Sequence, residues 1–347
     1  SWIHTTCPKC GGEAQRDPDT MDTFVDSAFY HLRYLSAERE DVPFDLERMK
    51  RWLPINLYVG GSDHATGHLI YFRFITRFLH DIGWCPVAEP AAKLIHQGHI
   101  TRGGIKMSKS KGNVVNPDEF TAKHGSDVFR MYLMFMGDYR TGGDWSDEGI
   151  AGVERFLNRV WRLVTRFAGA ASTPDEEVRA GEYPVELHRK LHATIKTVTE
   201  DLEAFTFNTA ISRMMELVNE FYAWVGEDGT SVDAAAAVRM LRVLVRLLAP
   251  FAPHFGEETW QRLGGEASVF DHPWPVHDEA ALATKTVLVV VQVNGKLRDR
   301  IQAPAGADRE ELKKLALASS RVAPYLREGE LRKAIVVPNK LVNLVIG

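Results

Sequence analysis

Cysteine and long apolar runs are scarce in this chain. It has three cysteines among 347 residues, too few for a disulfide framework, which favours a reducing compartment. No apolar run approaches the roughly 20 residues of a membrane-spanning helix. The first residues, Ser1 to His4, also lack the basic-then-apolar order of a secretory signal. We therefore expect a cytoplasmic protein without a membrane partner.

Positive charge is not in excess either. Lys and Arg number 42, Asp and Glu number 46, and the formal net charge is −4. The field of the whole chain therefore does not attract RNA, and any nucleic-acid contact has to come from local basic patches. Apolar residues make up 45% of the chain, which is enough to build the cores of two or three domains.

The N-terminal segment, residues 1–19, carries half of a zinc-ribbon pattern. Cys7 and Cys10 enclose two residues and are followed by Gly11, as in one knuckle of a zinc ribbon. A structural Zn²⁺ takes four ligands, and the third cysteine, Cys85, is remote in sequence. Two reduced thiols in a turn are therefore favoured over bound metal. The half site and the lack of an initiating Met predict that the chain begins inside a longer protein.

Residues 20–150 have an α/β pattern. An apolar strand candidate, residues 56–59, runs into Gly60 and Gly61, and residues 63–79 follow with helical spacing. A strand, a glycine turn and a helix form one unit of a doubly wound sheet. Such sheets place their ligands at strand ends, so this glycine turn is a candidate binding site.

The rest of the chain predicts a helical domain and a small mixed module. Apolar stripes at helical spacing fill residues 151–275 and predict a bundle. Residues 285–347 read as β-β-α-β-β, with Asn294-Gly295 as the hairpin turn. The expected fold is thus α/β plus α plus α+β: part of a doubly wound sheet, a bundle, and a small C-terminal module.

A loop rich in lysine follows a second strand candidate, residues 93–100, and precedes a helix that we expect Ser126 to cap. Glycines flank this loop, and its lysines present point charges that suit phosphate oxygens. A solvated charge run is the alternative interpretation, but a chance match to the five central residues is rare. Those five residues are Lys106, Met107, Ser108, Lys109 and Ser110.

This loop is typical of class I aminoacyl-tRNA synthetases, and the residues around it resemble the bacterial leucyl-tRNA synthetases. The resemblance implies ATP and Mg²⁺ as cofactors, with leucine and tRNA(Leu) as partners. It implies that Lys106 and Lys109 stabilise the pyrophosphate leaving group, while Met107 and Ser108 shape the approach to adenine and ribose. No nucleophilic side chain is required for this reaction.

Two further clusters match the same family. By resemblance, Gly60 and Gly61 leave room for adenosine and Asp63 accepts hydrogen bonds from the ribose; Glu is usual at that position. His64 and His68, one helical turn apart, would then form a wall of the leucine pocket. Taken alone, such a histidine pair is as compatible with a surface feature or half of a metal site as with a pocket wall.

The third match provides the rest of the leucine pocket. Phe24, Ser27 and Tyr30 are spaced to share one helix face, and the resemblance places all three against leucine. Ordinary core packing would explain the two aromatic residues but not the serine. The family usually has Trp at Phe29 and Tyr at His31, and both changes keep a large ring.

Two basic patches are candidates for tRNA binding. Four arginines lie along one side of a bundle helix, opposite its apolar stripe, and only Glu154 is nearby to neutralise them. A solvated basic face is the commoner meaning of such a row, but the resemblance favours RNA. The second patch, on the C-terminal hairpin, resembles a domain placed near the tRNA elbow. The residues are Arg155, Arg159, Arg162 and Arg166 in the first patch, and Lys296 and Arg298 in the second.

The resemblance covers the whole chain but only the second half of such an enzyme. We find no His-Ile-Gly-His sequence and no editing domain. The N-terminal half of the synthetase is therefore an expected partner, and it would also carry the missing zinc-binding cysteines. Two alternatives to a leucine–tRNA ligase fragment remain: a tRNA-binding or assembly module without catalysis, and a related synthetase for another amino acid such as valine or isoleucine.

Overall fold

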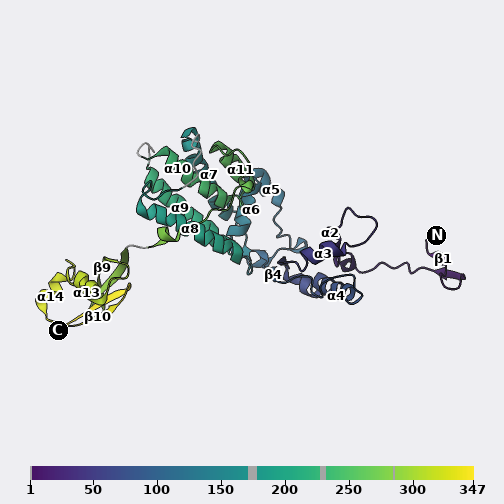
Figure 1. Ribbon diagram of the computed structural model, residues 1–347, viewed down its shortest axis with the longest axis horizontal. Helices are drawn as coiled ribbons and strands as arrows, with labels where there is room; N and C mark the ends of the chain where they lie inside the picture. Colours follow the sequence, from purple (N-terminus) through teal and green to yellow (C-terminus); the bar gives the residue numbers. More distant parts are fainter. Residues whose placement is uncertain (1, 171–177, 227–231, 284–285) are drawn as a thin grey trace. The chain divides into compact units, whose positions relative to one another are not determined.

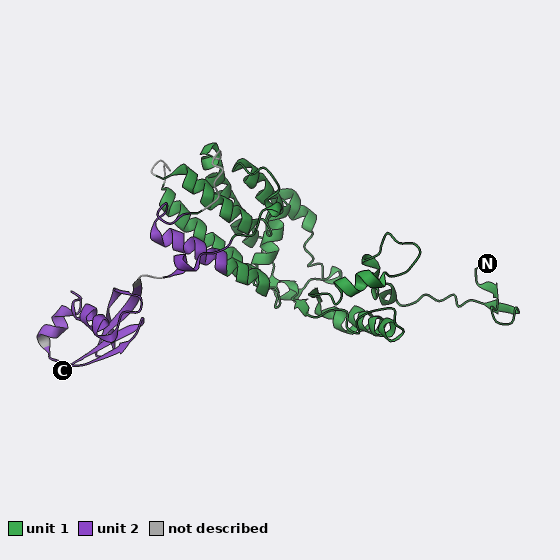
Figure 2. Cartoon of the chain, viewed as in Figure 1, with its two compact units in different colours: residues 1–178, 197–275 green, residues 179–196, 276–347 purple. Residues whose placement is uncertain are grey.

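The structure is a computed structural model of the 347-residue chain. It describes residues 2–170, 178–226, 232–283 and 286–347. The chain divides into two compact units (Figure 2). The first comprises Ser1–Val178 and Thr197–Pro275, and the second comprises Arg179–Lys196 and Val276–Gly347. Within the described ranges, no helix is long and apolar enough to cross a lipid bilayer.

The first unit begins with a small antiparallel hairpin. Strands β1 (His4–Thr6) and β2 (Glu13–Gln15) pair around a turn that contains both N-terminal cysteines. The amide of Cys7 donates to the carbonyl of Gly12 at 2.8 Å. The amide of Gly11, a residue with a φ of 73°, donates to the carbonyl of Cys7 at 2.9 Å. This is the tight knuckle that the sequence predicts.

A parallel β-α-β unit forms the centre of the α/β region. Strand β3 (Tyr58–Gly61) pairs in parallel with β4 (Leu94–Gln97). Between them lie a 3₁₀ turn, η1 (Ser62–Thr66), and helix α4 (His68–Asp81). The single helix predicted over residues 63–79 is therefore divided at Gly67. The strand, glycine turn and helix order is as expected, and it places the glycines at the carboxyl end of β3.

Three short helices cover this unit: α1 (Thr23–Ser27), α2 (Tyr30–Tyr34) and α3 (Leu46–Trp52). A buried cluster of Leu32, Met49, Leu79 and Cys85 holds α2 and α3 against α4. Burial of such side chains contributes about 1.5–3 kcal/mol each. The expectation of one continuous helix face for Phe24, Ser27 and Tyr30 is wrong, because α1 ends at Ser27 and α2 starts at Tyr30.

The lysine loop begins in strand β6 at the edge of a three-stranded sheet with the order β6-β5-β7. Its strands are β5 (Ile100–Arg102), β6 (Ile105–Lys106) and β7 (Gly143–Asp144), and a 3₁₀ turn, η2 (Lys109–Lys111), follows. Helices α5 (Pro117–His124) and α6 (Ser126–Phe135) come next. The prediction that Ser126 caps α6 is wrong: Ser126 is the first residue of the helix, and Gly125, with a φ of 85°, occupies the cap position, where no side chain accepts a hydrogen bond.

The bundle of the first unit is built on α7 (Gly149–Phe167), α9 (Phe207–Val225), α10 (Ala234–Leu248) and α11 (Pro253–Arg262). The later part of α8 (Val185–Ala204) joins them, along with the 3₁₀ turns η3 (Ala168–Ala170) and η4 (Val269–Asp271). Figure 1 shows α7, α9, α10 and α11 gathered in this bundle. The apolar stripe of α7 is buried as predicted, and α10 is buried nearly all round. A helix buried all round lies at the centre of a bundle.

The second unit contains the first part of α8, α12 (Glu279–Leu282) and a four-stranded sheet with the order β10-β11-β8-β9. The strands are β8 (Thr286–Val293), β9 (Lys296–Pro304), β10 (Leu331–Val337) and β11 (Leu341–Ile346). Asn294 and Gly295 have φ angles of 50° and 76°, as a two-residue hairpin requires. Besides the expected helix α13 (Arg309–Leu317), a second one, α14 (Ala323–Glu328), is present. The predicted module boundary at residue 285 lies outside the described residues.

Candidate active site

A chain of hydrogen bonds joins His68 to the side chains of Ser27, Tyr58 and Tyr30. Ser27 Oγ lies 3.0 Å from His68 Nδ1, and Tyr58 OH lies 2.8 Å from His68 Nε2. Tyr30 OH continues the chain at 2.9 Å from Tyr58 OH. The three side chains come from α1, α2 and β3, so this contact network fixes the imidazole ring from both sides.

The direction of this chain follows from Ser27. Its hydroxyl proton is donated to the carbonyl oxygen of Phe24 at 3.1 Å, so the oxygen accepts from His68 Nδ1–H. His68 Nε2 then accepts from Tyr58. Burial, with the nearby His64, lowers the pKa of His68, and burial raises the pKa of Tyr58. His68 is therefore neutral near pH 7 and present as one tautomer.

Phe24 and His64 complete a largely apolar wall. The Phe24 ring meets His64 edge-on at 6.2 Å between centroids, and it also packs against Tyr71. A Cβ added to Gly67 would lie 3.1 Å from the Phe24 ring, so this glycine allows the close approach. The predicted residues Phe24, Ser27, Tyr30, His64 and His68 are thus brought together, although from four separate helical segments, α1, α2, η1 and α4.

A pocket of about 320 Å³ opens beside this wall. It is lined by both glycines of the strand end, both predicted histidines and the first turn of α4, together with Tyr58 and His96. The volume is within the range of about 300–1,000 Å³ for small-molecule sites. A Cβ added to Gly60 would meet nothing within 4 Å, so the space above this residue is open to a ligand.

Asp63 lies in direct contact with the lysine loop. Lys106 Nζ is 2.9 Å from Asp63 Oδ2, and His99 Nε2 is 3.4 Å from the same ammonium. The Lys106 hydrogen bond is the main reason that the pKa of Asp63 is lowered. Both partners are more than half exposed, so they remain accessible to a ligand and contribute little to stability.

Two residues that the sequence did not single out hold the loop in shape. The Asn113 side chain accepts from the Ser108 amide at 2.9 Å and reaches the carbonyls of Ile105 and Lys106 at 3.4 Å. Asp144 accepts from the Gly104 amide at 2.9 Å and from the Thr101 hydroxyl at 2.5 Å. These bonds lower the pKa of Asp144, which stays ionised and anchors the glycine turn before Lys106.

Met107, Ser108 and Lys109 sit at the tip of this loop. Ser108 faces Ser110, with 3.2 Å between their hydroxyl oxygens, and Lys109 begins the turn η2. Gly112 ends that turn with a φ of 63°, a conformation that favours glycine. The loop is therefore a defined turn in which the first lysine, Lys106, belongs to strand β6.

The two N-terminal cysteines are close in the knuckle but do not complete a metal site. Backbone hydrogen bonds from Cys10 and Lys9 lower the pKa of Cys7, which favours the thiolate that zinc binds. Among the described residues, no group of three or more His, Cys, Asp or Glu side chains could hold a metal ion. The buried Cys85 belongs to the core cluster described above.

The predicted arginine row is split between two environments. Arg155 and Arg162 are exposed on α7, whereas Arg159 donates to Asn219 at 2.8 Å and lies over the ring of Tyr222. Arg166 contacts the carbonyl of Gly226 at 3.5 Å. Two of the four guanidinium groups are thus directed to the end and side of α9.

Glu154, the one acidic residue that we expected near the row, pairs instead with His124 at 3.0 Å. On the C-terminal hairpin, Lys296 is exposed, but Arg298 lies over the ring of Tyr325, with 4.5 Å from its guanidinium carbon to the ring centroid. Arg298 therefore packs within its own module.

Two family models match the chain. Residues 4–146 match the model described as tRNA synthetases class I (I, L, M and V), and residues 186–314 match the anticodon-binding domain of tRNA ligase. The first match covers the hairpin, the glycine turn and the lysine loop. The second begins in α8 and ends in α13.

Curated relatives are similar over almost the whole chain. A leucine–tRNA ligase of Caldanaerobacter subterraneus is 48% identical over 99% of this chain and 42% of the relative. One from Rubrobacter xylanophilus is 49% identical over 99% of this chain and 40% of the relative. The chain thus spans about two fifths of the length of these relatives.

Solved structures agree with this assignment. The ternary complex of the Agrobacterium radiobacter K84 agnB2 LeuRS with tRNA and LeuAMS has a TM-score of 0.83 and 39% identity, covering 100% of this chain and 45% of that one. A methionyl-tRNA synthetase of Mycobacterium tuberculosis shares the fold alone, with a TM-score of 0.53 and 20% identity over 80% of this chain and 54% of that one. The chain belongs to the leucyl-tRNA synthetase family and represents part of such an enzyme.

Proposed function

We propose that this chain supplies the lysine loop and the leucine pocket of a leucine–tRNA ligase. The enzyme would join leucine to ATP as leucyl-adenylate and then transfer the leucyl group to tRNA(Leu). The observation that carries the proposal is the contact of Lys106 with Asp63, one residue before His64. It brings a phosphate-binding loop, a ribose-binding carboxylate and an amino-acid pocket to the same strand end.

In the first step, a leucine carboxylate oxygen attacks the α-phosphorus of ATP. A new P–O bond forms as the bond to the β-phosphate oxygen breaks, and pyrophosphate leaves with the electron pair. Lys106 and Lys109 stabilise the charge that accumulates on this leaving group. Met107 and Ser108 shape the approach of the nucleotide, and Gly60, Gly61 and Asp63 receive the adenosine.

The chemistry of the pocket suits leucine. Phe24 and His64 provide apolar ring surface, and the neutral His68 adds no buried charge, because its hydrogen bonds to Ser27 and Tyr58 are satisfied. Tyr30 extends this network at the exposed side. An apolar branched side chain therefore meets the Phe24 ring and an imidazole, His68, whose two nitrogens are already hydrogen-bonded.

Mg²⁺ would enter with the ATP phosphates, because Mg²⁺ is usually held by phosphates and only one or two carboxylates. Asp63 accepts from Lys106, and Asp144 accepts from Gly104 and Thr101, so both carboxylates near the lysine loop are engaged in hydrogen bonds. Zn²⁺ at Cys7 and Cys10 requires further cysteines from outside this chain.

An N-terminal half of the synthetase is the partner that completes the site. Support comes from α4, where a stripe of large apolar side chains is exposed at every fourth position. Parallel strands are normally covered on both faces, yet β3 and β4 form a sheet of two strands. The exposed residues are Ile70, Phe74, Phe78 and Ile82.

For tRNA, we propose the exposed Arg155 and Arg162 as the main contacts on the bundle, with Arg159 and Arg166 at its margin. Lys296 and the module of residues 285–347 would contact the tRNA body, and Arg298 would position the hairpin. For the domains we propose a partial zinc ribbon over residues 1–19, a catalytic part over 20–150, a bundle over 151–275 and a tRNA-binding module over 285–347. Three free cysteines are compatible with the reducing cytoplasm.

A nonhydrolysable leucyl-adenylate analogue tests this proposal. Calorimetric titration into a mixture of this chain and a leucyl N-terminal half should show one tight site. His68→Ala should weaken that binding at least tenfold, whereas His80→Ala, an exposed histidine on the same helix, should not change it. Equal binding by both variants would overturn the assignment of the leucine pocket.

A further inference from the structure

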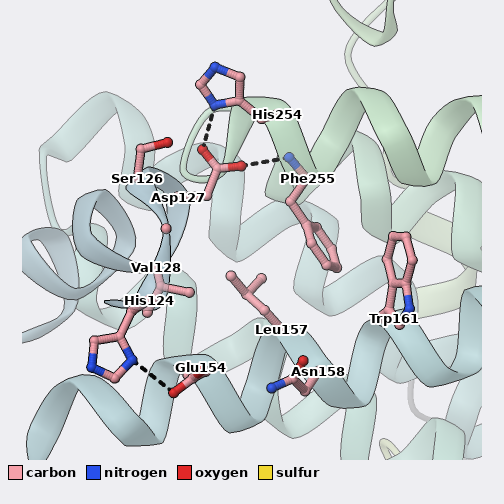
Figure 3. Close-up of a pocket in the computed structure, with 11 residues that line it drawn as sticks. His124, Ser126, Asp127, Val128, Glu154, Leu157, Asn158, Trp161, His254 and Phe255 are labelled. Atoms are coloured by element: carbon pink, nitrogen blue, oxygen red, sulfur yellow. Dashed lines mark hydrogen bonds and ion pairs between the residues drawn. The ribbon is translucent and has the colours of Figure 1, made fainter. Parts of the chain in front are cut away.

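A second pocket lies where α6, α7 and α11 meet, within the first unit and away from the lysine loop (Figure 3). Its volume is about 390 Å³, again within the range of small-molecule sites. We propose that it binds one unstacked guanine base of the tRNA. This inference rests on the proposed function, because it assumes that tRNA is the ligand.

The aromatic wall of the pocket suits a nucleobase. Trp161 of α7 lines it beside Phe255, with 6.1 Å between ring centroids. The guanidinium of Arg262 lies over the Trp161 ring at 4.5 Å. Trp161 is only partly buried, so its ring is accessible to a ligand. Binding sites for single-stranded nucleic acids often combine an aromatic ring with an arginine in this way.

Polar groups on the same helix give the pocket its hydrogen-bonding character. Glu154 uses Oε2 to pair with His124 at 3.0 Å, which leaves Oε1 as an acceptor toward a ligand. Asn158, one turn further along α7, is exposed and carries both a donor and an acceptor. Guanine presents N1–H and N2–H donors beside the O6 acceptor, so a carboxylate and an amide match its edge.

The walls are held in place independently of any ligand. Asp127 is buried, and its two oxygens accept from His254 Nδ1 at 3.0 Å and from the Phe255 amide at 2.5 Å. This carboxylate caps the start of α11 and ties it to α6, as Figure 3 shows. A base entering the pocket therefore meets a preformed site, which reduces the entropic cost of binding.

Affinity for a tRNA(Leu) transcript is the first test, measured by fluorescence anisotropy on the full chain. Trp161→Leu keeps an apolar side chain but removes stacking, and it should weaken binding by about 5- to 20-fold. Asn158→Ala should weaken it by about 3- to 10-fold. Thr165→Ala, exposed two turns after Asn158 on α7, is the matched control and should leave affinity unchanged.

Kethoxal footprinting identifies the base, because this reagent modifies N1 and N2 of unpaired guanine. The wild-type chain should protect one guanine, and Asn158→Ala at saturating concentration should restore its reactivity. If tRNA binds but no guanine is protected, the pocket proposal is overturned and the tRNA-binding proposal stands. If tRNA does not bind at all, both are overturned.

Discussion

Lys106 and Asp63 neutralise each other across the candidate active site, with 2.9 Å between Nζ and Oδ2. These residues lie 43 positions apart in sequence and are proposed to bind opposite ends of ATP. On this proposal the nucleotide would replace one ion pair with two contacts: the phosphates would attract Lys106, and the ribose hydroxyls would donate to Asp63. Because the pKa of Asp63 is lowered, the pair is intact above the ordinary carboxyl range and is lost as pH falls through that lowered pKa.

Lys109→Ala should lower the rate of adenylate formation by tens- to thousands-fold in a reconstituted enzyme. Its charge is proposed to act on the leaving pyrophosphate, so leucine affinity should change little. Single-turnover kinetics measure both quantities. Lys111→Ala removes a neighbouring charge from the same exposed turn and should have a much smaller effect; a loss confined to leucine binding would contradict the assignment.

His31→Phe should raise the stability of the chain, most of all at acidic pH. His31 is 6% exposed, and neither ring nitrogen has a hydrogen-bond partner in the described structure. Burial, with a smaller effect of His68, lowers its pKa to about 4. The unfolded chain binds the proton near pH 6.5, so stability falls as pH drops from about 6.5 to 4, by up to about 3 kcal/mol.

Urea unfolding at pH 5 and pH 8 measures this effect. The variant should be more stable by about 1 kcal/mol at pH 8, because two unpaired nitrogens leave the core, and the difference should widen at pH 5. His80→Phe is the control, since His80 is exposed on α4. A wild-type pH dependence that persists unchanged in His31→Phe would show that another group is responsible.

Replacing Arg155 and Arg162 with Gln should weaken tRNA binding. It should also reduce the slope of log affinity against log salt concentration by the equivalent of up to about two phosphate contacts. The same changes at Arg159 and Arg166 should have smaller effects on the salt slope, since those side chains contact α9. Filter binding across a salt series distinguishes the pairs. Identical slopes for wild type and the first pair would identify a merely solvated face.

Phe74→Ser and Phe78→Ser together should weaken association with an N-terminal half by at least tenfold. Both rings are more than half exposed on α4, so the isolated chain should lose little stability. Analytical ultracentrifugation of the mixture gives the affinity. Tyr34→Ser is the control at another exposed ring, and undiminished association of the double variant would exclude α4 as the docking face.

The sequence predicts helices and strands best where a single spacing of apolar residues dominates. The stripes of α7 and the β-branched run of β8 appear as expected, because burial of one face determines them. Helix ends were less predictable. The break at Ala28 and the turn before α4 depend on tertiary packing of Phe24 against Gly67, which spacing along the chain does not report.

The same distinction applies to the site. Residues with a proposed chemical task, such as Lys106, Asp63 and His68, stand out by type and position. Residues that position them are harder to find, because Tyr58, Asn113 and Asp144 act through contacts made only on folding. A signal was present for Tyr58, which brings a hydroxyl into an apolar strand two residues before Gly60.

Leucine-dependent pyrophosphate exchange with ATP is the most direct test of the central claim. Three samples should be assayed: this chain alone, the N-terminal half of the synthetase alone, and the two mixed. Each should be tested with leucine, valine, isoleucine and methionine. We expect exchange only in the mixture and, at low amino-acid concentration, only with leucine. The exchange should be lost when the chain carries Lys109→Ala. Robust exchange by the chain alone, or a preference for another amino acid, would contradict the account.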